Sequence, residues 1–190
     1  RDAVTWAGSA SAGKALNHPS GATTSFVLSG VRITAHSSAG GTAIADDAGS
    51  TDWLIRDCII SSGGNGTGRA VVMGPSGNGC RISNSYIIGS GIGFVDEAGG
   101  SSSTGMGNIR LDNCLVSSTT STLLVNDSNF WAIATVFTSA TAISNTSSFT
   151  SSELYLENCR FQCSTAAIKC TGGGSFQNST ILGCRFVNCP

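Results

Sequence analysis

The chain has 190 residues, the size of one domain, and ten Lys and Arg are balanced by eleven Asp and Glu. Only 11% of its residues are charged, so it has no basic stripe that could follow a phosphate backbone, and nucleic acid is not an expected partner. No apolar run approaches the roughly 20 residues of a membrane helix, so a membrane is not expected either. Ser, Thr, Gly, Ala and Asn dominate while Lys and Glu are scarce, which predicts an almost all-β protein.

Residues 1–25, RDAVTWAGSASAGKALNHPSGATTS, precede the repeat described next. We expect them to form a linker or a cap over the first rung. The stretch GSASAGKA from residue 8 approaches a phosphate-binding loop, but Ala15 stands where a hydroxyl should ligate Mg²⁺. No cofactor is therefore expected.

A six-residue pattern recurs along residues 26–190. Its copies are LSGVRI from 28, IRDCII from 55, ISNSYI from 82, LDNCLV from 111, a degraded IATVFT from 133, LENCRF from 156 and ILGCRF from 181. Aligning them places one column at Val31, Cys58, Ser85, Cys114, Val136, Cys159 and Cys184. The intervals of 22–29 residues match one coil of a solenoid, so we expect about seven rungs.

A second short apolar stretch follows in most rungs, as in TAIA from 42, AVVM from 70 and TLLV from 122. Gly- and Ser-rich turns separate the stretches. Such short strands can bury their apolar faces only if successive rungs stack at about 4.8 Å. The sequence therefore predicts a parallel β-solenoid over residues 26–190, and because a repeat lies so near Pro190 we expect it to be truncated at its C-terminal end.

The cysteine column is interpreted as small core residues, because valine and serine occupy the same column. Only Cys159 with Cys184, and Cys163 with Cys189, lie in adjacent rungs, so the disulfide state of these four stays open while six or more free thiols are expected. Cysteine spacing and the distant positions of His18 and His36 do not suit zinc, and no metal site is expected.

The strand signatures RDCII, DNCLV and ENCRF resemble the right-handed parallel β-helix of the pectate-lyase-like superfamily. Together with the Gly- and Ser-rich turns and few lysines, they look like β-helix proteins of bacteriophage tail spikes, tail fibres or capsids. This resemblance implies a virion structural or receptor-binding protein, a homotrimer that contacts other virion proteins and bacterial surface polysaccharide. Two alternatives are a polysaccharide hydrolase or lyase of the same fold, and a bacterial adhesin that is secreted or held at the cell surface.

Three acidic residues are candidates for catalysis if the chain is an enzyme: Asp96, Glu97 and Asp127. They follow the second strand of adjacent rungs, which would set carboxylates about 5 Å apart, as in retaining glycosidases. The other interpretation is that they only start turns. Four aromatic residues are candidates for carbohydrate stacking, with padding of the solenoid as the alternative role: Trp53, Tyr86, Trp131 and Tyr155.

Overall fold

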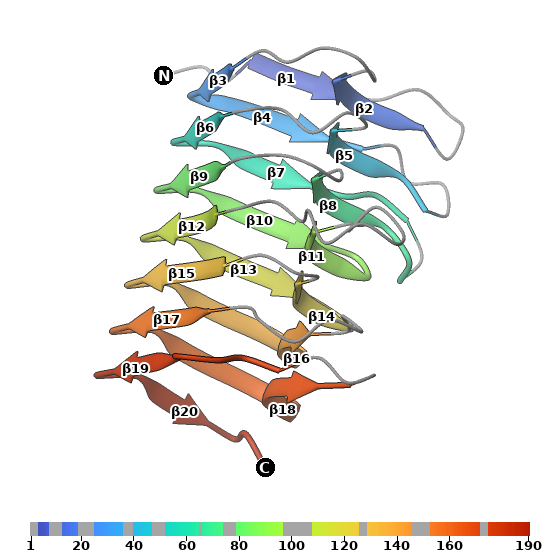
Figure 1. The fold of residues 1–190 in the computed structure, drawn as a ribbon. Coiled ribbons are helices and arrows are strands. Elements are labelled where there is room, and N and C mark those ends of the chain that lie inside the picture. The colour runs from blue at the N-terminus through green and yellow to red at the C-terminus, as the bar shows by residue number, and fades with distance from the viewer. Residues whose placement is uncertain are drawn as a thin grey trace.

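The computed structural model describes residues 4–7, 13–18, 25–35, 40–46, 52–64, 66–73, 79–96, 108–125, 129–145, 153–171 and 175–190. These residues form twenty strands, stacked as successive rungs between the two termini (Figure 1), and contain no helix. The described part of the chain consequently has no helix long and apolar enough to span a membrane.

The strands form three ladders that run along the solenoid axis. The first ladder contains β1 (Val4–Ala7), β4 (Val31–Thr34), β7 (Ile59–Ser61), β10 (Tyr86–Gly89), β13 (Leu115–Ser118), the starts of β16 (Val136–Asn145) and β18 (Arg160–Cys170), and β20 (Arg185–Val187). The second contains β2 (Lys14–His18), β5 (Thr42–Asp46), β8 (Arg69–Met73), β11 (Ile92–Asp96), β14 (Ser121–Val125) and the ends of β16 and β18. The third, on the left of Figure 1, contains β3 (Phe26–Ser29), β6 (Trp53–Arg56), β9 (Cys80–Ser83), β12 (Asn108–Asp112), β15 (Asn129–Ile133), β17 (Leu154–Glu157) and β19 (Thr180–Leu182).

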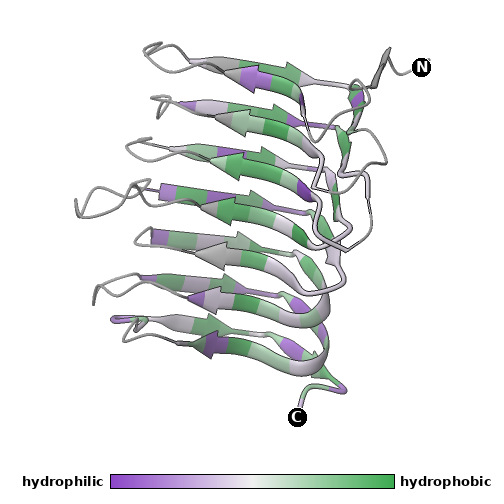
Figure 2. Ribbon diagram, turned by 90° about the vertical axis from the view of Figure 1, so that its right-hand side faces the viewer, coloured by the Kyte–Doolittle hydropathy of each residue, from purple (hydrophilic) through white to green (hydrophobic). Residues whose placement is uncertain are grey.

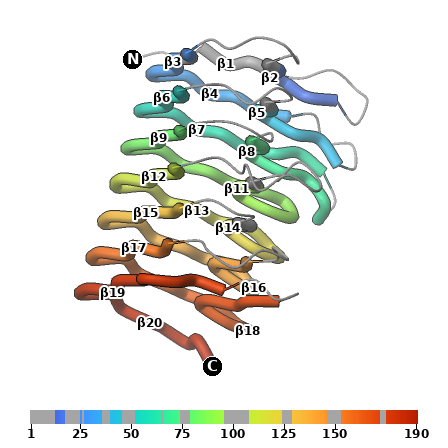
Figure 3. The backbone as a smooth tube through the Cα atoms, in the orientation of Figure 1, coloured from blue at the N-terminus to red at the C-terminus, as the bar shows by residue number. Residues whose placement is uncertain are grey.

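Each rung pairs in parallel with the next, as the continuous winding of the backbone in Figure 3 makes plain. Five turns, from β1–β3 to β13–β15, have three separate strands, whereas β16 and β18 each run through both the first and the second ladder. The predicted fold class, an all-β parallel solenoid, is confirmed. The number of similar turns is slightly smaller than the seven rungs expected. Strand β1 pairs with β4 and strand β2 pairs with β5, so both belong to the ladders described above. The boundary expected at residue 26 therefore has strands of the same ladders on both sides.

The core fills the interior between the ladders, because alternate residues point inward in strands such as β6, β9 and β12. Hydrophobic segments recur at matching places from rung to rung (Figure 2). Phe137 stacks on Phe161 with 5.0 Å between ring centroids, and Phe161 stacks on Phe186 at the same distance. Phe130 meets Phe137 edge-on at 6.4 Å. In-register pairing thus places like side chains on top of one another.

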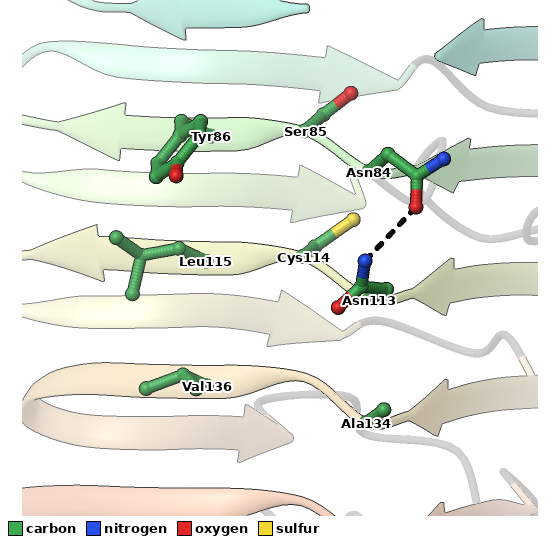
Figure 4. Close-up of a pocket in the computed structure, with 8 residues that line it drawn as sticks. All are labelled: Asn84, Ser85, Tyr86, Asn113, Cys114, Leu115, Ala134 and Val136. Atoms are coloured by element: carbon green, nitrogen blue, oxygen red, sulfur yellow. Dashed lines mark hydrogen bonds between the residues drawn. The ribbon is translucent and has the colours of Figure 1, made fainter. Parts of the chain in front are cut away.

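The corner between the third and the first ladder is built by one left-handed residue in each rung. These residues are Gly30, Asp57, Asn84, Asn113, Ala134, Asn158 and Gly183, with φ between 48° and 69°. Glycine, asparagine and aspartate tolerate this conformation best, which explains the small polar position of the repeat. The Asn113 amide donates to Asn84 Oδ1 at 3.0 Å (Figure 4), and the Asn84 amide donates to Asp57 Oδ1 at 3.4 Å. Asp57, Asn84 and Asn113 therefore form a hydrogen-bonded ladder along the corner.

The residue after each corner forms the core column, and here the predicted alignment is wrong at one position. Leu115 pairs with Val136, so Cys114 lies opposite Thr135, and Thr135 rather than Val136 belongs to the column. Thr135 is fully buried while Val136 is only half-buried and faces outward. The alignment slips because the corner residue of this rung is alanine, which does not mark a left-handed turn in a sequence.

Side chains of the core column also form hydrogen bonds with the backbone. The Ser85 hydroxyl donates to the carbonyl two residues earlier at 2.7 Å, and the Thr135 hydroxyl makes the same bond at 3.1 Å. The thiols of Cys114 and Cys159 lie 3.4 Å from the equivalent oxygens. Between rungs, the Cys58 backbone N–H donates to Ser85 Oγ at 3.1 Å. Serine, threonine and cysteine recur because each satisfies backbone groups at the corner.

Replacing Ala134 by asparagine is expected to stabilise the fold by about 1 kcal/mol. Alanine in the left-handed region costs about 1–2 kcal/mol, which asparagine partly avoids, and the new amide would lie between those of Asn113 and Asn158. Urea denaturation of Ala134→Asn measures the change, and Ala134→Gly, which relieves only the backbone strain, is the control. A midpoint unchanged or lowered in Ala134→Asn would contradict the role given to the ladder.

Candidate ligand-binding face

The outer surface of the third ladder carries a continuous row of large polar and aromatic side chains. Alternation is strict: the second residue of β6, β9 and β17 and the third residue of β12 and β15 point outward, and the neighbours of each are buried. Backbone pairing joins Arg81 to Arg110, Arg110 to Trp131, and Trp131 to Tyr155. We call Arg81, Arg110, Trp131 and Tyr155 the outer row. Its members project from adjacent strands, so they form one surface rather than separate contacts.

Asp112 holds the two arginines of the outer row. Arg110 Nε lies 2.9 Å from both carboxylate oxygens, and Arg81 approaches Oδ2 to 3.0 Å through Nε and 2.8 Å through a terminal nitrogen. The arginine side chains remain 57% and 45% exposed. Exposed ion pairs of this kind contribute little to stability. The carboxylate instead orients two guanidinium groups whose other N–H donors face solvent.

Trp131 and Tyr155 continue the row as a pair of half-buried aromatic side chains. The Tyr155 hydroxyl donates to Glu157 Oε2 at 3.0 Å. This hydrogen bond to the carboxylate raises the pKa of Tyr155, so the phenol stays protonated at neutral pH. The bond also fixes the direction of the ring. The row therefore joins positive charge at one end to aromatic surface at the other.

Two hollows flank the face. One, of about 230 Å³, opens where the strands begin and includes Arg81 and Arg110 in its lining. The other, of about 380 Å³, opens at the corner past the strand ends (Figure 4), and its lining is Asn84, Ser85, Tyr86, Asn113, Cys114, Leu115, Ala134 and Val136. Only the first hollow includes members of the outer row, so it is the recess that a ligand on the row could enter.

The four aromatic candidates do not form one site. Trp53 is only 3% exposed because it occupies an inward position of β6, so it offers little surface to a ligand, and its role in carbohydrate stacking stays a prediction. Tyr86 is 51% exposed but belongs to the first ladder. Only Trp131 and Tyr155 are brought together.

The three acidic candidates are not placed in a site. Strand β11 ends at Asp96, whose backbone pairs with Met73, but its side chain lies outside the part described. Glu97 and Asp127 lie outside the described residues altogether. Catalysis by these carboxylates stays a prediction. In the described ranges, no three His, Cys, Asp or Glu side chains are grouped so that they could hold a metal ion.

The core thiols are poorly suited to act as nucleophiles. Burial raises the pKa of Cys114 and of Cys159 to about 11, and it also raises the pKa of Cys58. Since the thiolate is the reactive form, these side chains stay protonated at neutral pH. Their role is to contact backbone carbonyl oxygens at the corner.

The sequence interpretation missed Arg81, Arg110 and Asp112. The two arginines could have been found by counting from the core column, because both lie four residues before it, as Tyr155 does. No family model matches the chain, and no curated protein or solved structure matches it.

Proposed function

We propose that the chain is a binding module that holds an extended carbohydrate along the outer row. The observation that carries the proposal is the in-register succession of Arg81, Arg110, Trp131 and Tyr155 on four adjacent strands. Three rung steps of about 4.8 Å make this row about 14 Å long. Aromatic side chains offer apolar faces to sugar rings, while guanidinium donors suit hydroxyl and carboxylate oxygens. The chemistry favours a glycan that carries some negative charge.

The wider setting of this proposal is a spike, fibre or capsid-associated protein of a virion that recognises bacterial surface polysaccharide. The resemblance of the RDCII, DNCLV and ENCRF segments supports it, and the solenoid fold is compatible with it. A homotrimer belongs to the same proposal. Exposed Tyr86 and Ile88 on the first ladder offer apolar surface for a neighbouring subunit, away from the outer row.

Trp131→Ala is expected to weaken binding of a charged bacterial polysaccharide at least tenfold, about 1.4 kcal/mol, because the row loses its largest apolar surface. Calorimetry with a panel of neutral and acidic bacterial polysaccharides measures the affinity. Tyr86→Ala is the matched control, since it removes an exposed aromatic from a different face and should leave binding unchanged.

Three outcomes count against the proposal. They are no binding by the unmodified chain to any polysaccharide, equal affinity in Trp131→Ala, and an equal loss in Tyr86→Ala. New reducing ends released during incubation would favour the hydrolase alternative, and Asp127→Asn would then show whether that carboxylate is responsible.

A further inference from the structure

Two cysteines of the last two rungs meet at a second left-handed corner. Gln162 pairs with Val187, so Cys163 of β18 lies across from Asn188, with Cys189 one residue further. Asn188 has φ 53°, and the Cys189 thiol lies 3.5 Å from the Val187 carbonyl oxygen. This is the corner geometry that Asn158 and the following cysteine show. The turn at Asn188 moves Cys189 out of the strand register and toward Cys163.

The Cys189 thiol lies between the last two rungs. Its Sγ is 3.7 Å from the carbonyl oxygen of Phe161, two residues before Cys163 in the same strand. Burial, followed by the nearby Cys189 thiol, raises the pKa of Cys163 to about 12.

Solvent can reach this pair. A hollow of about 390 Å³ opens beside it, with Cys163 and Asn188 in its lining. Cys163 is itself buried, at 2% exposure, but Cys189 is half-buried. The remaining lining is mostly hydroxyl-bearing: Ser118, Thr119, Thr138, Ser139 and Ser164, with Ala140 and Gln162. A small polar disulfide could enter such a recess.

The other adjacent pair, Cys159 and Cys184, is less suited to a covalent bond. Their backbones are directly opposite, because Arg160 pairs with Arg185. In-register parallel strands keep the two Cβ atoms about 4.8 Å apart, beyond the roughly 3.5–4.5 Å that a disulfide needs.

We propose that Cys163 and Cys189 are a site of reversible disulfide formation that links the last two rungs. The oxidant is a small disulfide such as oxidised glutathione. The Cys189 thiolate attacks one glutathione sulfur and releases one glutathione thiolate. Cys163, whose raised pKa makes this the slow step, then attacks the Cys189 sulfur, and its proton passes to the second glutathione sulfur, which leaves as a thiol. Two protein thiols are oxidised and one glutathione disulfide is reduced.

The bond would tie the short strands β19 and β20 to β18. It closes a loop between residues 163 and 189, which restricts the unfolded chain at this end of the solenoid. Cleavage after Arg185 by trypsin under native conditions should therefore slow severalfold on oxidation.

The test uses the full chain incubated in oxidised or reduced glutathione, then alkylated and denatured. The thiol titre is expected to fall from eight to six on oxidation. Trypsin separates the two cysteines into single-cysteine peptides, residues 161–169 (FQCSTAAIK) and residues 186–190 (FVNCP), so one cross-linked mass identifies the bond. Reduction should return both peptides.

Cys170→Ser is the control, because Cys170 is exposed and should not affect the link. Cys163→Ser and Cys189→Ser should each abolish it, and circular dichroism checks that each variant folds. An unchanged titre of eight in the oxidised chain overturns the proposal. So does a link between peptides 111–160 and 170–185, which would indicate Cys159 and Cys184 instead.

Discussion

Replacing Phe137 by alanine is expected to lower the free energy of unfolding by about 3–5 kcal/mol. Its ring is fully buried, stacks on Phe161 at 5.0 Å and meets Phe130 at 6.4 Å. Truncation leaves a cavity between two rungs that the paired backbones cannot close, because their spacing is set by hydrogen bonds. Guanidinium denaturation followed by circular dichroism measures the loss.

The matched control is Phe186→Ala, at the other end of the same stack. Phe186 is 48% exposed and, among the described residues, stacks on Phe161 alone, so its truncation leaves no enclosed cavity. We expect less than half of the Phe137→Ala effect. Equal losses would mean that burial within the stack does not determine stability.

Gly89→Ala is the second variant with a large expected effect, a loss of about 3 kcal/mol or more, at the upper end of ordinary overpacking. Gly89 ends β10 at the bend into β11. A Cβ atom there would lie 2.0 Å from the Ile92 carbonyl oxygen and 2.3 Å from its carbon. Since both are backbone atoms, the bend itself must open. Soluble yield and the denaturation midpoint report the effect.

Gly30→Asn separates this steric conflict from glycine replacement in general. Gly30 has φ 69°, but a Cβ atom added to it would have no neighbour within 4 Å, and asparagine occupies the equivalent corner at Asn84. We expect a change within about 0.5 kcal/mol. A Gly89→Ala protein as stable as Gly30→Asn would show that the bend is not tightly packed.

The ladder arrangement could be predicted because in-register stacking requires the same backbone conformation and the same size of core side chain in every rung. A left-handed corner favours glycine, asparagine or aspartate, and the next position favours a small side chain that bonds the corner carbonyl. In six rungs the corner residue is glycine, asparagine or aspartate, so these rungs can be aligned from the sequence. In the remaining rung the corner residue is Ala134, and the sequence pattern therefore assigns the column to Val136 instead of Thr135.

That single slip also misplaces Trp131 relative to the other residues of the outer row. Counted from Val136, Trp131 lies five residues before the column, in the same inward phase as Trp53 before Cys58. Counted from Thr135 it lies four residues before, in the outward phase of Tyr155. Strand alternation decides burial, so an error of one residue exchanges core and surface. The ion pairs around Asp112 depend on side-chain conformation and could not be read from spacing.

The left-handed corners also define the unit by which such a chain can change length. Asn84 and Asn113 have nearly equal φ, and each is followed by a buried residue of the core column. A chain without residues 85–113 would pass from Asn84 to Cys114 through the same corner. Whole coils are thus interchangeable segments, and removing this one would take Arg110 out of the outer row and bring Arg81 beside Trp131.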